Sequence, residues 1–449
     1  MMKKNATNQI TEGIIWKQLL LFFFPIVLGT FFQQIYNTAD AIVVGRYVGK
    51  EALASVGGST SQIINLVVGF FVGLSSGATV VIAQFYGARD QKNINRALHT
   101  AIAFSIAGSI VITILGLLFS PFFLQLMQTP QNLMADSTLY LRVYFAGIFF
   151  VFIYNIGSGI LRATGDSRRP LYFLIVCCFL NIILDVVFVV GLHMAVAGVA
   201  LGTLISQGVS AVLVLIALFR SRDIFRLRLK ELHFHRASLQ SLLRIGIPAG
   251  LQSVMYNISN VIIQACLNTF GTDTVAAWTA FGKMDAFYWM VCSAFGIAIT
   301  TFIGQNYGAG KYNRMRKSVR ICFAMAMGSS IAISAVLLIF GSYIFQIFTG
   351  DAIVVEIGME MVRFMVPFYS IYVFIEILSG ALRGTGNVLI PMLMTCGGVC
   401  LLRLFWIIVM LPIHREIITI IFSYPISWSI TALMFIFYYL RESRKWPKV

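Results

Sequence analysis

The sequence predicts an all-α polytopic membrane protein with about twelve transmembrane helices, arranged in two pseudo-symmetric lobes of six. Three observations lead to this fold class. Hydrophobic residues make up 59% of the chain and charged residues 11%, and the mean hydropathy is +0.86, whereas a soluble domain carries about 25% charged residues. Apolar stretches long enough to cross a bilayer follow one another along the whole chain. The second half also repeats motifs of the first half at an offset of 221 residues.

Each predicted span is an apolar stretch of roughly 20 residues or more, the length at which an α-helix crosses the hydrocarbon core of a bilayer. In chain order we expect the spans near 17–44, 54–84, 97–120, 136–161, 170–191, 196–219, 240–268, 276–304, 318–347, 356–382, 388–411 and 417–440.

The repeat is clearest where predicted helices end on the cytoplasmic side. Segment 158–165 (SGILRATG) returns as 379–386 (SGALRGTG), and segment 84–88 (QFYGA) returns as 305–309 (QNYGA). Glycine most readily takes the left-handed conformation that closes a helix C-terminus. We therefore expect four cap glycines at these helix ends: Gly87, Gly165, Gly308 and Gly386.

The distribution of charge predicts the topology. The formal net charge is +16, and with a cytoplasmic N-terminus 26 of the 33 Lys and Arg residues lie at cytoplasmic ends. This is the positive-inside bias, so we expect both termini in the cytoplasm and no nucleic acid as a partner. The basic segment 220–239 then forms a cytoplasmic linker between an N-terminal lobe at 1–219 and a C-terminal lobe at 240–449.

Glycines and prolines inside the spans predict how the helices pack and bend. Glycines four residues apart let neighbouring backbones approach closely, and a proline bends a membrane helix. The glycine rows are Gly69, Gly73 and Gly77 in span 2 and Gly198 with Gly202 in span 6; the prolines are Pro25, Pro248 and Pro367.

Polar side chains in the N-terminal lobe fall on two predicted helix faces. Span 1 carries Gln33, Asn37 and Asp40 at i, i+4 and i+7. Span 5 carries Asn181 and Asp185 at i and i+4. A charge at the bilayer centre costs about 2.5–3.5 kcal/mol on insertion scales, so acids in spans are functional candidates.

If the two faces meet, the cluster has two physical uses. Two adjacent carboxylates in low dielectric cannot both stay ionised, so one of them can carry a proton at neutral pH. The same oxygens, with the hydroxyl of Thr203 in span 6, can instead replace part of the hydration shell of a sodium ion. Hydrogen-bonded packing of Asp40 and Asp185 is the structural alternative.

The C-terminal lobe carries a different set of polar groups. Lys283 and Asp285 lie two residues apart and cannot face each other on a helix, so we expect Glu376 to pair with Lys283. A structural ion-pair network and a substrate or second ion site both stay open. The candidates are Tyr256, Asn257, Asn260, Lys283, Asp285 and Glu376, and Arg403 in span 11 is a further charge.

Together these features strongly resemble the multidrug and toxic compound extrusion (MATE) family of antiporters, most closely its bacterial DinF-like branch. The resemblance covers nearly the whole chain. It rests on the two six-span halves, the polar stretch Gln33-Gln34-x-x-Asn37-x-x-Asp40, the paired QxYGA and LRxTG segments, and Asn181-x-x-x-Asp185.

The resemblance implies a MATE-type fold and export by alternating access between the lobes, driven by inward proton or sodium flow. It assigns the coupling ion to Asp40, Asn181, Asp185 and Thr203. From the residues of span 1 themselves, Asn37 is a further candidate for the ion site, and Gln33 and Gln34 are candidates for a substrate cleft or polar network. The other main bacterial branch has acids in spans 7 and 10. Span 7 has no acid here, so a sodium site of that kind is not expected in the C-terminal lobe.

We therefore expect a secondary active efflux transporter for organic, cationic or amphipathic compounds in the bacterial inner membrane. Its coupling ion is H⁺ or Na⁺; no cofactor is expected, and no metal beyond sodium at Asp40 and Asp185. The expected partners are small organic substrates and membrane lipids, and the expected state is a monomer. A flippase for a lipid or lipid-linked precursor is the alternative, although only Lys283 and Arg403 could line its cleft with positive charge. An enzyme is not expected, because no metal cluster or nucleophile–base pair appears.

Overall fold

The computed structural model describes residues 9–221 and 225–447, and within these ranges every regular element is a helix. The two ends of the chain, which the charge bias predicts to be cytoplasmic, and linker residues 222–224 lie outside the described residues. The chain forms two compact units. One is Phe24–Gly250, and the other is Leu251–Val449 together with the N-terminal stretch up to Phe23.

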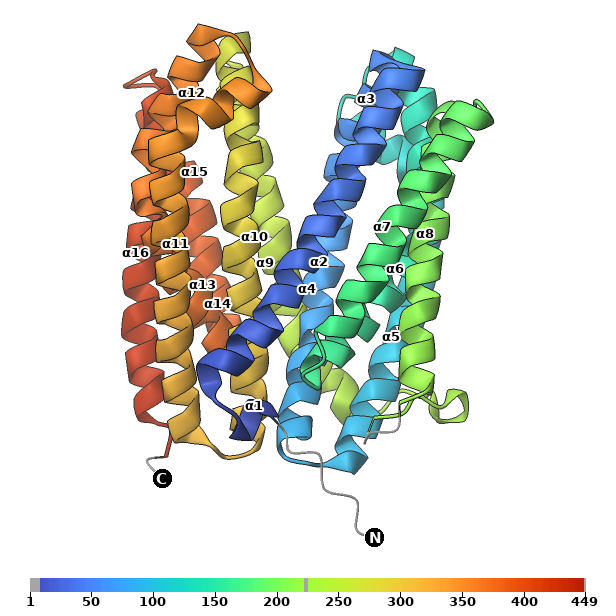
Figure 1. The fold of residues 1–449 in the computed structure, drawn as a ribbon, viewed down its shortest axis with the longest axis vertical. Helices are drawn as coiled ribbons and strands as arrows, with labels where there is room; N and C mark the ends of the chain where they lie inside the picture. The colour runs from blue at the N-terminus through green and yellow to red at the C-terminus, as the bar shows by residue number, and fades with distance from the viewer. Residues whose placement is uncertain (1–8, 222–224, 448–449) are drawn as a thin grey trace. The chain divides into compact units, whose positions relative to one another are not determined.

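The unit Phe24–Gly250 contains most of the first long helix and all of the elements up to the start of α9 (Figure 1). Its elements are α2 (Ile15–Val43), the π-helical turn η1 (Val44–Val48), α3 (Lys50–Gly57), α4 (Ser59–Gly87), α5 (Gln91–Leu126), α6 (Gln131–Ala163), α7 (Arg168–Asp185), the π-helical turn η2 (Val186–Gly191), α8 (Ala195–Phe219), the 3₁₀ turn η3 (Leu229–Glu231) and the first part of α9 (Arg236–Asn268).

The other unit contains the short helix α1 (Gln9–Glu12), the first residues of α2 and the C-terminal helices. After the second part of α9 come α10 (Thr272–Gly308), α11 (Tyr312–Phe348), α12 (Ala352–Met365), the 3₁₀ turn η4 (Val366–Phe368), α13 (Tyr369–Gly384), α14 (Leu389–Thr395), the π-helical turn η5 (Cys396–Leu401), α15 (Leu402–Met410) and α16 (Ile417–Arg444).

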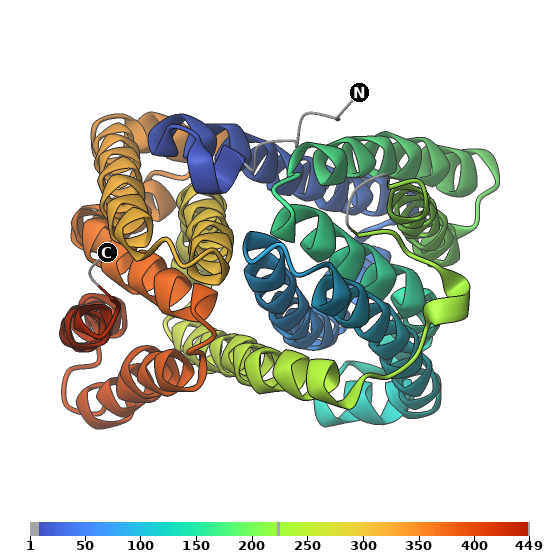
Figure 2. The same ribbon diagram turned by 90° about the horizontal axis from the view of Figure 1, so that it is seen from below.

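The two units repeat one packing scheme. In the first, α6 packs against α4, α5 and α8; in the second, α13 packs against α10, α11 and α16. The helices of each bundle are seen nearly end-on in Figure 2. The two halves that share sequence motifs therefore also share the same pattern of contacts between helices.

Eleven helical stretches among the described residues are long and apolar enough to cross a membrane. They coincide with every predicted span except 240–268. That span is helix α9, whose 33 residues could also cross the bilayer. It carries a row of amide side chains that lowers its hydropathy, among them Gln252, Asn257, Asn260 and Gln264. The predicted fold class, an all-α polytopic membrane protein, is confirmed.

Four helices end in the same way, but only two of the predicted cap glycines take the left-handed conformation. Gly165 and Gly386 have φ of 94° and 87°. In the other pair the left-handed residue lies two positions after the expected glycine, at Arg89 (φ 58°) and Gly310 (φ 68°). Gly87 and Gly308 are instead the last helical residues, so the prediction for them was wrong.

All four ends are Schellman motifs, in which two backbone N–H groups satisfy the last free carbonyls of a helix. After α10, Gly310 N–H donates to Tyr307 O at 3.0 Å and Lys311 N–H donates to Asn306 O at 2.8 Å. The same pair of bonds closes α4, α6 and α13. The capping hydrogen bonds, not the position of the nearest glycine, determine which residue takes the left-handed conformation.

The glycine rows bring helices together as expected. A Cβ on Gly77 would lie 2.4 Å from the Leu242 carbonyl oxygen, and one on Gly73 would lie 2.6 Å from the backbone of Ala249, so α4 and α9 are in backbone contact. Pro25 and Pro248 lie inside α2 and α9. Pro367 instead sits in the 3₁₀ turn that separates α12 from α13.

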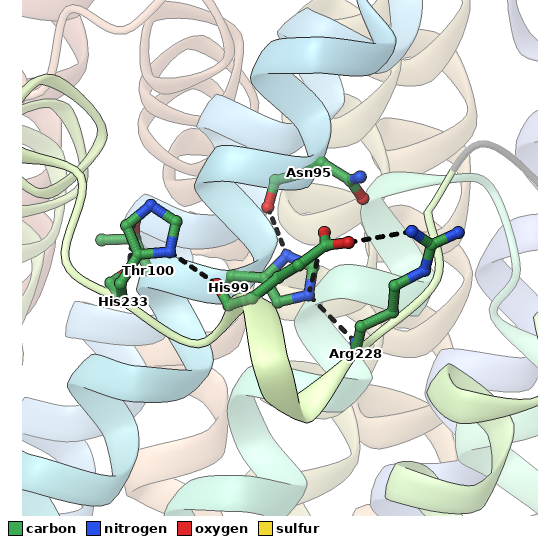
Figure 3. A network of polar contacts seen from close by, with 6 residues as sticks. Asn95, His99, Thr100, Arg228 and His233 are labelled. Carbon is green, nitrogen blue, oxygen red and sulfur yellow. Dashed lines mark hydrogen bonds and ion pairs between the residues drawn. The ribbon is translucent and has the colours of Figure 1, made fainter.

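The linker, residues 220–239, is hydrogen-bonded to the first part of α5 (Figure 3). The backbone N–H of Arg228 donates to Nε2 of the buried His99 at 3.0 Å, while Nδ1 of His99 lies 2.7 Å from the Asn95 carbonyl oxygen. The Thr100 hydroxyl accepts from His235 N–H at 3.1 Å. An ion pair of 2.9 Å between Arg228 and Glu231 closes the turn. These bonds join the described part of the linker to α5 within the same unit.

Candidate functional site

The structure brings four polar side chains of the N-terminal half into one buried cluster, contributed by three helices. Asp40 lies on α2, Asn181 and Asp185 lie on α7, and Thr203 lies on α8. Asn181 and Asp185 have no exposed surface, and Asp40 and Thr203 are each 6% exposed. The side chains of Asn181 and Asp185 lie beside the Asp40 carboxyl, and the Thr203 hydroxyl donates to Asp40 Oδ2 at 3.5 Å.

Local backbone geometry holds Asp185 in place. It is the last residue of α7, and the π-helical turn η2 begins directly after it. Gly202 of α8 faces its carboxyl, because a Cβ there would lie 2.5 Å from Asp185 Oδ1. π-Helical turns in α-helices are frequent at functional sites. The small residue and the widened turn together let two helices close around one acid.

Most of the polar atoms of the cluster have no hydrogen-bond partner among the residues that the structure describes. These atoms are Asp40 Oδ1, both carboxyl oxygens of Asp185, and both Oδ1 and Nδ2 of Asn181. Buried polar groups in proteins are nearly always satisfied, and a buried charge without a partner costs several kcal/mol. A proton or a cation held by these oxygens removes that cost. Carboxylate, amide and hydroxyl oxygens are also the ligands that hard cations prefer.

The predicted polar face of span 1 is not a single buried face. Asp40 is buried, whereas Gln33, Gln34 and Asn37 are exposed. Tyr36 shares the buried side of α2 with Asp40, and Gln207 Nε2 donates to its hydroxyl at 3.4 Å. The helix is rotated so that Tyr36, four positions before Asp40, faces the unit interior, whereas Asn37, three positions before Asp40, does not. Asn37 therefore lies outside the buried cluster.

The C-terminal unit contains a cavity of about 580 Å³. This size lies within the usual range for small-molecule sites. Five of the sequence-predicted candidates line it: Tyr256, Asn257, Asn260, Asp285 and Glu376. They come from α9, α10 and α13, and three tryptophans complete the wall, namely Trp278, Trp289 and Trp428.

Hydrogen bonds fix the acidic wall of this cavity. Asp285 accepts from the Tyr369 hydroxyl through Oδ1 and from the Trp289 indole N–H through Oδ2. The Tyr256 hydroxyl lies 3.0 Å from that of Tyr372. Both carboxyl oxygens of Asp285 are thus held by neutral donors, and among the described residues the recorded ion pairs include none with Asp285.

The predicted ion pair between Lys283 and Glu376 is absent from the described residues: Lys283 is exposed, and the Glu376 carboxyl lies against the backbone of Gly296. As expected, Lys283 and Asp285 do not face each other. Their two-residue separation turns one toward the outside of α10 and the other into the cavity. Lys283 accordingly does not line the cavity, and neither do Gln33 and Gln34.

Sequence reasoning noted Arg403 as an intramembrane charge but did not count it among the site candidates. In the structure it is 3% exposed and lines the same cavity. Its guanidinium carbon lies 3.8 Å from the ring centroid of Tyr424. The general cost of a charge inside a membrane was the signal that could have found it.

Comparisons with known proteins agree with the repeat and the fold. A family model described as MatE matches residues 25–187 and, a second time, residues 248–409. The probable multidrug resistance protein YoeA of Bacillus subtilis (strain 168) is 25% identical over 97% of this chain and 95% of its own length. A MOP superfamily transporter from Pyrococcus furiosus, whose reverse polarity of binding pocket suggests a different function for it, has a TM-score of 0.93 at 22% identity over 100% of both chains.

An outward-facing structure of a multidrug resistance MATE family transporter has a TM-score of 0.91 at 22% identity, with 99% of each chain covered. At this identity the solved structures show a shared fold. The family model goes further, because its two matches take up most of the sequence and fall one in each half. This helical, multi-pass membrane protein therefore belongs to the MATE family.

Proposed function

We propose that the protein exports organic cationic or amphipathic compounds by proton- or sodium-coupled antiport. The observation that carries the proposal is the buried cluster of Asp40, Asn181 and Asp185. Its oxygens without hydrogen-bond partners would be stabilised by binding a proton or a sodium ion. Relatives named as multidrug resistance proteins support export as the direction of transport.

The energetics suit this role. Moving one positive charge inward across a potential of 100 mV releases about 2.3 kcal/mol, which can drive modest uphill export. An ion drives a conformational change only if it binds the two conformations with different affinity. A cluster built from three separate helices suits this requirement, since a small shift of one helix would change the set of oxygens around the ion.

The cavity of the C-terminal unit supports an organic substrate. Its volume fits a drug-sized molecule, and tryptophan faces attract organic cations. Its charged wall holds two acids and one arginine, a balance that does not favour the large anionic headgroup of a lipid-linked precursor. The positive-inside bias supports a cytoplasmic position of both termini, and the bacterial relatives support a location in the cell membrane of a bacterium.

Transport of a fluorescent cationic dye in reconstituted vesicles tests the proposal, with pH and sodium gradients imposed separately. Asp40→Asn and Asp185→Asn should each lower ion-driven efflux about tenfold or more, because a coupling free energy of a few kcal/mol is lost. Both variants should still be expressed and folded. The dependence of the wild type on the two gradients identifies the ion.

Asp136→Asn provides the matched control, since it makes the same chemical change on an exposed acid at the start of α6. Its efflux should equal that of the wild type. Full gradient-driven efflux by both cluster variants would remove the proposed ion site, and equal loss in the Asp136 variant would point to a general effect of lost negative charge.

A further inference from the structure

Basic side chains from two parts of the chain meet where the linker crosses the start of α5. Lys92, Arg96 and Thr100 lie four residues apart, so they share one face of that helix. The linker contacts this row at Thr100, whose hydroxyl accepts from His235 N–H at 3.1 Å and lies 3.5 Å from the His233 carbonyl oxygen (Figure 3). The two imidazole rings lie 4.7 Å apart. Together the four side chains form a basic cluster: Lys92, Arg96, His233 and His235.

The positive charge of the basic cluster is not balanced by the acids near it. Charged and titratable groups come to this contact from three segments: Lys92, Arg96 and His99 on α5, Glu231 and His233 in the linker, and Arg236 at the start of α9. Glu231 pairs with Arg228 at 2.9 Å, and Asp90 caps the N-terminus of α5. The ion pairs recorded among the described residues include none with Lys92 or Arg96. An anion bound here would offset the repulsion between these cations.

The crowding of positive charge changes how His235 titrates. Partial loss of solvent lowers the pKa of its imidazole. The charges of Arg96, His233 and Lys92 lower this pKa further. A bound anion acts in the opposite direction, because it stabilises the protonated ring. Binding of an anion therefore takes up protons, and its affinity increases as the pH falls.

Apolar side chains of the linker are exposed next to the basic cluster. Phe234, between the two histidines in the sequence, is 52% exposed, and Leu229 is 67% exposed. The cluster also lies at the first turns of α5, a helix long and apolar enough to cross a membrane. Basic and exposed apolar groups together at the end of a membrane helix are typical of the boundary between lipid headgroups and water. This combination favours a lipid over a soluble anion.

We propose that the basic cluster binds the phosphate of an anionic phospholipid, more tightly at lower pH, while Phe234 packs among the acyl chains. Lys92 and Arg96 supply positive charge and N–H donors for the phosphate oxygens. The two histidines add charge when they take up protons. The basic cluster shares no residue with the buried ion cluster or with the cavity of the C-terminal unit, so the inference goes beyond the proposed export function.

Native mass spectrometry of the purified full-length protein measures lipid binding, with dioctanoyl phosphatidylglycerol as the anionic probe and dioctanoyl phosphatidylcholine as the zwitterionic one. The wild type should bind the first phosphatidylglycerol about tenfold more tightly than phosphatidylcholine. Equal affinities would overturn the proposal. Inorganic phosphate should not displace the phosphatidylglycerol, and its displacement would assign the cluster to a soluble phosphate and contradict a lipid site.

A pair of double variants locates the contact. Lys92→Gln, Arg96→Gln should weaken binding of phosphatidylglycerol about tenfold or more and leave binding of phosphatidylcholine within about twofold. Lys317→Gln, Arg320→Gln is the matched control, since it removes two exposed cations from the start of α11, the helix that corresponds to α5 in the repeat. It should leave both dissociation constants within about twofold of the wild-type values. Equal losses in the two double variants would assign phosphatidylglycerol to the basic surface in general and contradict the proposal.

The dependence of binding on pH tests the two histidines. The affinity of the wild type for phosphatidylglycerol should rise about threefold to tenfold between about pH 8 and about pH 6, because the histidines gain protons while the phosphodiester keeps its single charge. His233→Gln, His235→Gln should bind this lipid with the same affinity at both pH values. A wild type whose affinity does not change with pH, or a histidine variant that keeps the full change, would contradict the proposal.

Discussion

At the scale of single residues, the proposed ion site depends on a glycine, Gly202, which has no side chain to occupy the space next to Asp185. Gly202 gives the Asp185 carboxyl its space, since any Cβ at that position would come within 2.5 Å of Oδ1. Asp185 has no exposed surface, so its carboxyl has little room to retreat. The orientation of this acid is thus set by a glycine on the neighbouring helix α8.

Gly202→Ala should therefore weaken ion binding while the protein still folds. The added methyl group turns the Asp185 carboxyl away from Asp40, and we expect the ion concentration for half-maximal transport to rise about tenfold, roughly 1.4 kcal/mol. Titration of dye efflux against the coupling ion measures it.

Gly208→Ala is the control on the same helix, because its nearest neighbour would be Phe150 at 3.6 Å, an ordinary contact. It should leave the titration unchanged. A Gly202→Ala protein with wild-type ion dependence would show that the position of the Asp185 carboxyl does not matter for transport.

At the scale of elements, the repeat is preserved most closely in how helices end. Four helices close with the same Schellman bonds, although the left-handed residue is glycine in three of them and Arg89 in the fourth. A side chain in the left-handed region costs about 1–2 kcal/mol. The geometry of the turn has therefore been kept even where the residue best suited to it is absent.

Gly310→Ala should lower the free energy of unfolding by about 1 kcal/mol, because the φ of 68° at this position is unfavourable for alanine. Steric contact is not the cause, since no atom lies within 4 Å of the new methyl group. Gly328→Ala, inside α11 and equally free of contacts, should raise stability by about 0.5–1 kcal/mol through its helix propensity. Thermal unfolding in detergent compares the two. Equal shifts of the same sign would show that backbone conformation does not distinguish these sites.

At the scale of the whole molecule, the chain passes from one compact unit to the other inside helices, not in loops. The boundary lies after Phe23 in α2 and after Gly250 in α9. Pro25 and Pro248 lie within two residues of these boundaries, and they are the first residues of the two matches of the family model. A proline removes one backbone hydrogen bond, so each helix is easiest to bend where it changes units.

Replacing both prolines by alanine should make α2 and α9 harder to bend at these positions. We expect the Pro25→Ala, Pro248→Ala double variant to transport dye several-fold more slowly, up to about tenfold, and to unfold at a higher temperature, because the missing helix bonds return. Pro121→Ala, in α5 and away from both boundaries, is the control and should transport at the wild-type rate. A double variant that transports at full speed would exclude bending at these prolines as a step in transport.

The sequence determined what short spacings and composition encode. Hydropathy and the 221-residue repeat gave the membrane fold and its two halves, and positions i and i+4 placed Asn181 and Asp185 on one side of α7. The sequence also pointed to polar candidates in the second half, and five of these candidates line one cavity.

Only the tertiary structure decided which side of each helix faces inward. It buried Tyr36 with Asp40 and left Asn37 exposed, turned Lys283 outward, and directed Arg403 into the cavity. The physical reason is that a membrane helix is apolar on the side facing lipid and on the side facing its neighbours. Its hydrophobic pattern therefore carries little information about rotation, and only contacts between helices far apart in the chain can set it.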